Sequence, residues 1–466
     1  MIPERLAWLV DPELPPMQLG ELFARAGHQL YLVGGSVRDA FLERDFERDF
    51  DFATDARPDD IEGILRRWSP VVYTVGKAFG TVGAISDGHT VEVTTFRSEV
   101  YRDDSRKPQV TFSDDIEIDL SRRDFTVNAM AVALPAVEPI DPFGGAADLA
   151  ARVLRTPLEP EVSFSDDPLR MLRLFRFQAT LDFEPHRKAV EAATEMSGRL
   201  AIISAERIRD ELSRLLTAPD PTDALWGLVE SGLSDEFLPE LARLGMEQDP
   251  VHHHKDVLAH TIAVTAKASP DLVLRLAALL HDIGKPDTRE FGQGGVTFHH
   301  HEVIGARMAR HRLRALRYPK EVVSDVSQLV FLHLRPHTLE MGWTDSAVRR
   351  YVRDAGHLLD RLNELVRCDV TTANERRART IQRRIDDLEE RIEHLAEKEE
   401  LARLRPPIDG NQVMAYLGIP PGPLVGELMD VLLERRIEEG PYSEEEAYSM
   451  IRQVATDRGV PDPGVP

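Results

Sequence analysis

Two aspartates, Asp49 and Asp51, stand two residues apart in the segment DFDFAT. In a β-strand alternate side chains point to one face, so both carboxylates would converge while Phe50 and Phe52 pack on the opposite face. Two adjacent carboxylates repel each other unless a cation lies between them, and their hard oxygen atoms suit Mg²⁺. Such ions can activate an attacking hydroxyl and stabilise a leaving pyrophosphate. The pair therefore predicts a magnesium site that works on phosphate esters.

A glycine pair precedes this strand. Gly34 and Gly35 follow an apolar run and lead into SVRDAFLER, which is predicted to be a helix. The unpaired N–H groups of the first helical turn would face whatever lies above the carboxylates. A triphosphate fits there, with Arg38 as a candidate charge partner. Each feature alone is weak, because Gly-Gly turns are common and an Asp pair on a strand is more often a solvated edge or turn.

The combined pattern LVGGSVRD…DFDFAT resembles the nucleotidyltransferase signature of the polymerase β superfamily, and in detail the class II tRNA nucleotidyltransferases. These are the CCA-adding enzymes and their poly(A) polymerase relatives. The resemblance continues in chain order through four further motifs: DLSRRDFTVNAMA at 119–131, DPFGGAADLAARVLRTP at 141–157, SDDPLRMLRLFRF at 165–177 and SAERIRDELSRLL at 204–216. It implies template-independent addition of CCA to the 3′ end of tRNA from CTP and ATP, with Asp49 and Asp51 as the catalytic Mg²⁺ ligands.

The segment SDDPLRMLRLFRF has two interpretations. Pro168 suits the first position of a helix and Asp167 its N-cap, which would make the segment a capped amphipathic helix with solvated arginines. Asp167 and Arg170 are also neighbours on one helix face and offer acceptors and a fork of donors to a base edge. The resemblance assigns base selection to this pair and places Arg173 and Arg176 near the base and the phosphates.

The roles expected for other residues of the head depend more heavily on the resemblance. Adjacent arginines such as Arg122 and Arg123 normally mark a solvated turn, and only the surrounding motif gives them a triphosphate to contact. Glu92 has the setting of the third carboxylate of the superfamily, and its role as a metal ligand or as support for the sheet stays open. The segment at 97–108 resembles the flexible loop with which CCA-adding enzymes switch from C to A, so it favours full CCA addition.

A second candidate metal site lies in the middle of the chain. Imidazole and carboxylate ligands suit a transition metal or Mg²⁺ with open positions for water and a phosphate ester. The residues resemble the ligand set of the HD phosphohydrolases, which implies a site for Mn, Ni, Co or Mg: His260, His281, Asp282 and Asp369, with His301 and His333 as accessory ligands. The HD fold could equally serve only as a platform for tRNA.

The elements that would position these residues divide the chain into a β-rich and a helical part. Short β-rich runs at 28–34, 71–74, 81–85 and 90–96 predict an N-terminal sheet, and long amphipathic segments follow from about 160 onward. We expect an α+β protein in which a polymerase β-like head with a mixed sheet precedes all-α parts. The expected domains are the head at 1–155, a helical neck for nucleotide selection and tRNA at 156–245, an HD domain at 246–375 and a helical tail at 376–466.

One predicted tail helix has an unusually narrow apolar seam. Between 376 and 405, apolar residues recur at spacings of four and three, with charge at nearly every other position. The seam is too short for a dimeric coiled coil, so we expect it to pack on a neighbouring helix. The C-terminal segment 408–434 resembles the tail of bacterial enzymes with this domain order, notably those of actinobacteria.

Composition limits the possible functions. A formal charge of -23 over 466 residues argues against non-specific adhesion to nucleic acid or anionic membranes, but it leaves room for local basic grooves. We expect basic grooves of this kind in the neck and at the Arg-rich start of the helix at 376–405, where they would contact tRNA. The single cysteine, Cys368, excludes an internal disulfide. No apolar stretch approaches the ~18 residues of a membrane span, so the chain is expected to be cytoplasmic. The oligomeric state is not predicted.

Two alternative functions remain. A poly(A) polymerase would share every head motif, but the HD segment and the loop at 97–108 count against it. An HD phosphohydrolase with a non-catalytic head would leave the Asp49 and Asp51 pair without a role.

Overall fold

The computed structural model describes residues 4–44, 49–100, 109–246, 256–292, 295–335, 343–370, 375–399 and 405–460. It forms two compact units. The N-terminal unit comprises Met1–Arg243 and Arg312–Tyr318, and the C-terminal unit comprises Leu244–His311 and Pro319–Pro466. No helix in the described ranges is both long enough and apolar enough to cross a bilayer.

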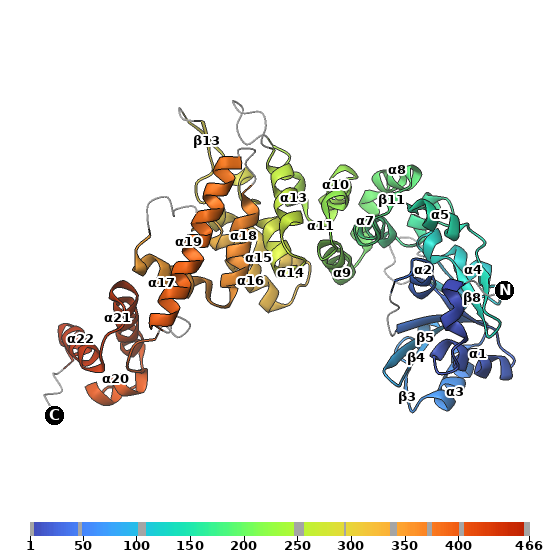
Figure 1. Cartoon of the computed structure of the whole chain (residues 1–466), viewed down its shortest axis with the longest axis horizontal. Coiled ribbons are helices and arrows are strands. Elements are labelled where there is room, and N and C mark those ends of the chain that lie inside the picture. The colour runs from blue at the N-terminus through green and yellow to red at the C-terminus, as the bar shows by residue number, and fades with distance from the viewer. Residues whose placement is uncertain are drawn as a thin grey trace. The chain divides into compact units, whose positions relative to one another are not determined.

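The N-terminal unit is built on a seven-stranded sheet of order β3-β4-β5-β2-β1-β8-β9 (Figure 1). β2 and β5 run parallel, and all other neighbours in this sheet run antiparallel. The sheet is therefore mixed, as predicted for the head. Its strands are β1 (Leu30–Val33), β2 (Asp49–Thr54), β3 (Val71–Tyr73), β4 (Thr81–Ser86), β5 (His89–Thr95), β8 (Ala131–Leu134) and β9 (Glu138–Ile140).

One face of this sheet is a closed hydrophobic layer. Leu32, Phe52 and Val93 are aligned across β1, β2 and β5, and all are buried. Helix α1 (Pro15–Arg25) packs closely on this face, because a Cβ on its Gly20 would lie only 2.9 Å from the Cβ of Leu134. Further helix cover comes from α3 (Pro58–Trp68), which contacts β3, β4 and β5.

The opposite face carries a hydrophobic cluster at one end. A buried cluster that includes Val33, Ala53 and Leu120 fills the end beneath α4 (Ile116–Ser121). The N-terminal end of β2 lies outside this cluster. Among the described residues, the side chains of Asp49 and Asp51 on this face are exposed where β2 begins.

The same unit contains further helices. They are α2 (Gly35–Phe41, between β1 and β2), α5 (Gly145–Ala151), α6 (Pro160–Asp166), α7 (Leu169–Leu181), α8 (Arg187–Glu195), α9 (Ala205–Leu216), α10 (Thr222–Glu230), α11 (Leu233–Phe237) and α12 (Pro239–Ala242). Ten residues of α7 are buried, and this helix contacts both α9 and α10. A hairpin of β6 (Arg97–Val100) and β7 (Gln109–Phe112) and a parallel pair of β10 (Val153–Leu154) and β11 (Glu184–Pro185) complete the N-terminal unit.

The C-terminal unit is helical apart from a short hairpin, β12 (Glu290–Gly292) and β13 (Gly295–Thr297). Its helices are α13 (Val257–Lys267), α14 (Leu272–Leu280), α15 (His301–Ala315), α16 (Lys320–Leu332), α17 (Asp345–Ala355), α18 (Leu359–Asp369), α19 (Glu375–Glu399), α20 (Gly410–Leu417), α21 (Pro423–Glu439) and α22 (Glu444–Asp457). The end of α15 from Arg312 onward belongs to the N-terminal unit. The long helix with the narrow seam is α19. Its Ile385, Leu388, Ile392 and Leu395 are buried, and it contacts α17 and α18. The seam therefore packs on neighbouring helices, as the sequence predicts.

Candidate functional site

The aspartate pair lies at the open end of the sheet. Asp49 and Asp51 are exposed on β2, whereas Phe50 and Phe52 between and beside them are each 1% exposed. Phe50 stacks on Trp8, with 6.1 Å between the ring centroids. This contact holds β2 in place on the face opposite the two aspartates. Both carboxylates therefore share one face of the sheet, as their spacing predicts.

Glu92 adds a third carboxylate. The parallel register of β2 and β5 pairs Asp51 with Glu92, and Glu92 is exposed on the same face. The pKa of Asp51 is raised, chiefly because the surrounding protein displaces part of the water around its carboxylate and further by Glu92 and Asp49, while Arg123 opposes the shift. Carboxylates held close together repel one another and are stabilised by a divalent cation, and three of them supply the hard oxygen ligands of Mg²⁺. The donor set fits a metal centre on this face.

The glycine pair and an arginine lie directly beside this centre. Gly34 adopts φ +75° between β1 and α2. A Cβ at Gly34 would lie 3.2 Å from Nη1 of Arg123 and 3.8 Å from Oδ2 of Asp51. Backbone, guanidinium and carboxylate thus meet around a glycine that lacks the side chain to fill the space. Gly35 begins α2, as the predicted turn requires.

Arg38 has other partners in this structure. Its Nε and Nη2 donate to the carboxylate of Asp39 at 2.9 and 2.8 Å, and its Nη1 donates to Oδ1 of Asn128 at 2.9 Å. Its guanidinium also lies 5.6 Å from the ring centre of Phe177. Arg38 therefore joins α2 to the segment that follows α4, and its proposed contact with a triphosphate stays a prediction.

The arginine doublet is held by a buried acid that sequence reasoning missed. The side chain of Asp119 is 1% exposed and lies 2.9 Å from Nη2 of Arg122 and 3.2 Å from Nη2 of Arg123. Burial alone would raise the pKa of Asp119, but the two arginines hold it below its ordinary value. Both guanidiniums are mostly buried, so the doublet is not a solvated turn. The i,i+3 and i,i+4 spacing of these residues could have revealed the pairing.

Asp167 forms an ion pair with Arg207, which lies outside the motif that contains Asp167 and Arg170. Oδ2 of Asp167 lies 2.7 Å from Nη2 of Arg207, and its Oδ1 accepts the N–H of Leu169 at 3.2 Å. Pro168, rather than Asp167, occupies the N-cap of α7, so the predicted helix start is one residue too early. Arg170 donates to Oγ of Ser163 at 2.8 Å and to the carbonyl oxygen of Arg122. The predicted base-selecting pair thus lies where α6, α7 and the arginine doublet meet.

The next two arginines of α7 share one carboxylate. Glu211 of α9 is buried and places Oε1 3.0 Å from Nε of Arg173 and Oε2 2.5 Å from Nε of Arg176. Arg173 also pairs with Asp124 at 3.1 Å. Burial lowers the pKa of Arg176 to about 10. Sequence reasoning did not identify Asp124 or Glu211 as functional, although both lie inside quoted motifs.

The histidine-rich part of the C-terminal unit forms two ligand clusters among the described residues. In the first, Nε2 of His260 lies 3.3 Å from Nε2 of His281 and 2.9 Å from Oδ1 of Asp369. In the second, which joins Asp282 to His301 and His333, Nε2 of His301 lies 3.4 Å from Oδ1 of Asp282. The structure therefore brings all six of the expected residues together in these two clusters.

Asp282 connects the clusters. Its Oδ2 lies 3.1 Å from Nε2 of His281, while its Oδ1 faces His301. The Nδ1 atoms of His281, His301 and His333 lie 2.6 to 2.8 Å from the backbone oxygens of Ala278, Phe298 and Val330. A ring whose Nδ1–H is occupied by a carbonyl presents Nε2 as the metal-binding nitrogen. The donor set and the ring orientations therefore fit two neighbouring cations.

The charge states of two of these histidines differ. Complete burial lowers the pKa of His333 to about 3, so this ring is neutral and able to ligate. Burial would also lower the pKa of His281, but the carboxylates of Asp282 and Asp369 raise it to about 9. A cation bound there would replace that proton.

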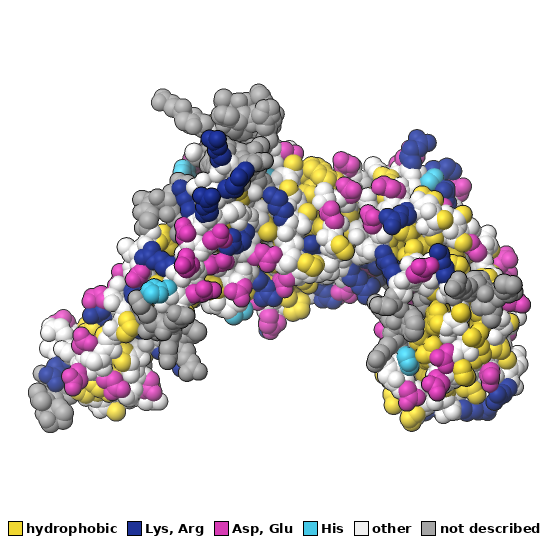
Figure 2. Space-filling model, in the orientation of Figure 1, with side chains coloured by type: hydrophobic (Ala, Val, Ile, Leu, Met, Phe, Trp, Pro, Cys, Tyr) yellow, Lys and Arg dark blue, Asp and Glu magenta, His cyan; other side chains and the backbone are white. Residues whose placement is uncertain are grey.

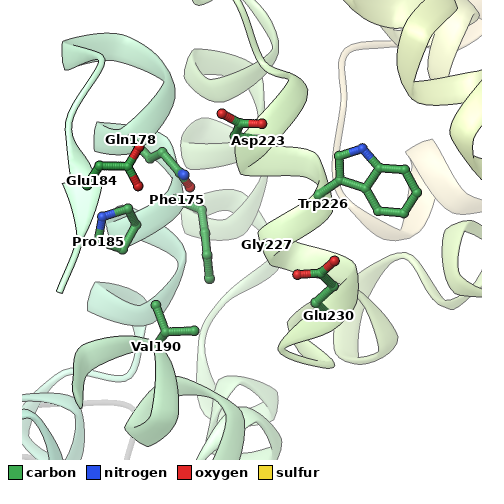
Figure 3. Close-up of a pocket in the computed structure, with 9 residues that line it drawn as sticks. All are labelled: Phe175, Gln178, Glu184, Pro185, Val190, Asp223, Trp226, Gly227 and Glu230. Carbon is green, nitrogen blue, oxygen red and sulfur yellow. The ribbon is translucent and has the colours of Figure 1, made fainter. Parts of the chain in front are cut away.

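A cavity of about 570 Å³ lies apart from both centres, between α7, β11, α8 and α10 (Figure 3). Its lining includes Phe175 and Gln178 of α7 and Trp226 and Gly227 of α10. None of the predicted site residues lines this cavity. The close approach of α7 and α10 depends on Gly227, because a Cβ there would lie 2.2 Å from the Phe175 ring.

The predicted basic start of the long tail helix is visible on the surface. Figure 2 shows Lys and Arg side chains gathered over the end of α19 that follows α18. Arg376, Arg379 and Arg383 are exposed there. The group supplies local positive charge on a chain of net charge -23.

Three family models match the chain in succession. They are the poly A polymerase head domain at residues 30–155, the probable RNA and SrmB-binding site of polymerase A at 182–244, and the HD domain at 257–400. Among curated proteins, the chain is 35% identical over 461 residues to the A-adding tRNA nucleotidyltransferase of Deinococcus radiodurans. The aligned region covers 96% of this chain and 98% of the relative. It is 32% identical over 411 residues to the CCA-adding enzyme of Geobacillus thermodenitrificans, covering 88% of each.

Solved structures agree with this grouping. The CCA-adding enzyme of Bacillus stearothermophilus in complex with CTP matches with a TM-score of 0.68 and 25% identity, over 98% of this chain and 99% of that one. The CCA-adding enzyme of Thermotoga maritima, complexed with tRNA, shares the fold with a TM-score of 0.58 at 17% identity, over 97% of this chain and 99% of the other. Because a relative is more than 30% identical over nearly its whole length, this chain belongs to the bacterial tRNA nucleotidyltransferase family that includes CCA-adding and A-adding enzymes.

Proposed function

We propose that this protein adds CCA to the 3′ end of tRNA, without a nucleic-acid template, from CTP and ATP. The observation that carries the proposal is the open face of β2, where Asp49, Asp51 and Glu92 lie together beside Gly34 and Arg123. Full-length relatives that are named CCA-adding and A-adding enzymes support the same reaction class.

In this reaction the terminal O3′ of the RNA forms a bond to the α-phosphorus of the nucleotide. The bond between the α- and β-phosphoryl groups breaks, pyrophosphate leaves and the hydroxyl proton passes to solvent. Divalent Mg²⁺ bound by Asp49 and Asp51 would lower the pKa of that hydroxyl and neutralise charge on the phosphates. Arg123 adds positive charge on the Gly34 side, where Gly34 and Gly35 leave space for the triphosphate.

Nucleotide selection is assigned to α7. Asp167 and Arg170 would present an acceptor and a fork of donors to the base edge. Arg173 and Arg176 would act nearby, with their positions set by Glu211. Arg38 and Arg122 would support the triphosphate site from the side, through Asn128 and Asp119 respectively. We propose that the tRNA body contacts the neck and the basic start of α19.

A narrower reaction is the second candidate. The relative from Deinococcus radiodurans that covers 96% of this chain is an A-adding enzyme, which favours addition of the final A alone. The loop expected to favour full CCA addition spans 97–108, of which residues 101–108 lie outside the described residues.

The test offers tRNA ending before CCA, after C and after CC to the purified protein with CTP, ATP or both, and sequences the 3′ ends. Ordered addition of C, C and A supports the proposal. Extension of the CC-ending tRNA alone, with ATP, supports the narrower A-adding reaction. Long A tails indicate a poly(A) polymerase, and phosphoester hydrolysis without extension indicates an HD phosphohydrolase with a non-catalytic head.

We further propose a phosphohydrolase activity at the HD site. The two clusters joined by Asp282 carry this proposal, because neighbouring cations can hold a phosphate ester and activate water. Mn, Ni, Co and Mg are the candidate metals. Chelated protein reloaded with each metal should hydrolyse a generic phosphodiester only with the cation that the site accepts, and no hydrolysis with any of them would indicate a structural role.

A further inference from the structure

The open face of the sheet continues from the catalytic acids toward its edge at β3. The strand register places Glu92 opposite Gly83 and Gly83 opposite Tyr73. A Cβ on Gly83 would lie 2.1 Å from Cζ of Tyr73, so the tyrosine ring lies directly over this glycine. The Tyr73 hydroxyl donates to Oε1 of Glu92 at 3.3 Å. The aromatic ring is therefore held in place next to the carboxylate that flanks Asp51.

A second row of side chains on this face begins at Asp49. The register aligns Asp49 with Thr90, Thr90 with Ile85, and Ile85 with Val71. Ile85 is 42% exposed and Val71 52% exposed, although both are large and apolar. Together with Tyr73 they form an exposed apolar surface, which we term the β3–β4 strip (Val71, Tyr73 and Ile85).

The chemistry of nucleotidyl transfer assigns opposite sides of the acids to the two substrates. The attacking oxygen and the leaving pyrophosphate lie roughly in line on either side of the α-phosphorus. Arg123 and Gly34 adjoin Asp51 from the side of β1 and α2, and they are the proposed neighbours of the triphosphate. The strands β5, β4 and β3 lie on the other side of the acids (Figure 1), so the attacking hydroxyl would arrive from there.

The geometry points to an acceptor subsite on the β3–β4 strip, which binds the 3′-terminal nucleoside of the RNA acceptor. Its base packs on the Tyr73 ring and the neighbouring Ile85 and Val71, and its hydroxyl reaches the centre at Asp49 and Asp51. An aromatic face stacks on any base, which suits an RNA end whose last base changes with each addition. This inference rests on the proposed nucleotidyl transfer.

Variants of the strip should affect the acceptor and not the nucleotide. Gly83→Ala keeps every charge and every partner residue but displaces the Tyr73 ring. Because one base–aromatic stack is lost, we expect KM for a tRNA minihelix to rise roughly 10-fold while KM for CTP stays the same. The double variant Val71→Ser with Ile85→Ser should raise the acceptor KM in the same direction. Tyr73→Phe keeps the ring and should keep the acceptor KM.

The matched control is Ile118→Ser on α4, since Ile118 has the same 42% exposure as Ile85 in the same unit. This variant should leave both KM values unchanged. If strip variants and control behave alike, or if KM for CTP changes instead, the subsite is wrong. Thermal melting of each variant identifies those that fail to fold.

A cross-link on the unmodified protein tests the same point without substitution. A minihelix whose last nucleotide is 4-thiouridine, irradiated on the protein, should attach to the peptide that carries Tyr73 or Ile85. Attachment confined to other peptides would overturn the inference. A wild-type protein that extends no RNA contradicts the proposed function itself, whereas normal extension with unaffected strip variants contradicts only the subsite.

Discussion

At the scale of single residues, carboxylates play two different parts in and around the face of the sheet that we propose to be catalytic. Asp49, Asp51 and Glu92 are gathered with like charge around a space suited to a cation. Asp119 is instead buried and paired with two arginines. The first group is expected to affect the reaction more than the fold, and the second the fold more than the reaction.

The change Asp51→Asn keeps the size of the side chain and removes its charge. Loss of a metal ligand removes several kcal/mol of transition-state stabilisation, so extension of tRNA should fall by roughly 1000-fold. Single-turnover extension with saturating CTP measures this effect. Asp87→Asn, in the turn between β4 and β5, is the control and should extend normally; retained activity in the Asp51 variant would refute the metal-ligand assignment.

Asp119→Asn should destabilise the N-terminal unit in a pH-dependent way. The folded-state pKa of Asp119 lies below its unfolded value, so its stabilisation is present above pH ~4 and is lost as the pH falls through the folded pKa. Breaking a buried ion pair costs about 3 kcal/mol at pH 7. Urea unfolding at pH 7 and in acid should show the difference from wild type shrinking as the pH falls.

The control for this prediction is Asp114→Asn. Asp114 pairs with Arg57, but its side chain is 79% exposed. An exposed ion pair contributes less than about 1 kcal/mol, so this variant should match wild type at every pH. An equal loss in both variants, or a loss from Asp119→Asn that does not depend on pH, would contradict the interpretation.

At the scale of elements, α7 carries the residues that we propose to select the nucleotide, and it packs against α9 and α10. Glu211 of α9 binds two of its arginines, and Gly227 of α10 allows close contact with its Phe175. The orientation of the proposed selecting side chains therefore depends on two helices outside the motif that carries them.

Glu211→Gln removes the charge shared by Arg173 and Arg176. Misplacement of selecting groups by about 1 Å can reduce rates up to roughly 100-fold, so kcat/KM for CTP and ATP should fall while addition of UTP and GTP changes less. Sequencing of products from mixed nucleotides measures the loss of selectivity. The control is Glu206→Gln, because Glu206 lies on the exposed side of α9. Unchanged selectivity in the Glu211 variant would show that the ion pairs only stabilise the fold.

Gly227→Ala should loosen the contact of α7 with α10. The new Cβ would lie 2.2 Å from Cε1 of Phe175, and such overpacking typically costs about 1–3 kcal/mol. Gly63→Ala in α3 is the matched control, because no atom lies within 4 Å of its new Cβ. This control should be stabilised by about 0.5–1 kcal/mol through its higher helix propensity. Thermal unfolding compares the two, and equal shifts would contradict the packing explanation.

At the scale of the whole molecule, the two candidate centres belong to different compact units. The aspartate centre lies in the N-terminal unit and the histidine clusters lie in the C-terminal unit. The finer division into four domains stays a prediction. Two centres with separate ligands should carry separate activities.

His281→Ala should abolish phosphodiester hydrolysis and metal binding at the HD site. Extension of tRNA should stay within about twofold of wild type, because the changed residue shares no partner with the aspartate centre. The reciprocal variant, Asp51→Asn, should hydrolyse normally. Metal content by mass spectrometry together with both activity assays provides the measurement, and loss of extension in a folded His281 variant would refute the separation.

The sequence by itself determined the features that depend on spacing along one element. Alternation along a strand put Asp49 and Asp51 on one face, whatever the remaining fold. The ordered motifs identified the family, and their ligand types identified both candidate metal centres. These conclusions needed only local geometry and residue chemistry.

Only the tertiary structure decided which charges pair. Arg207 forms an ion pair with Asp167, and Glu211 forms ion pairs with two arginines of α7. Asp282 lies between two groups of histidines. The Tyr73 ring over Gly83 likewise results from strand register. An arginine can pair with any acid that lies close enough, and the distance between the two groups is set by how distant segments of the chain pack together. Local spacing can reveal a pair within one helical turn, as for Asp119 and its two arginines, but it carries no information on pairs between distant segments.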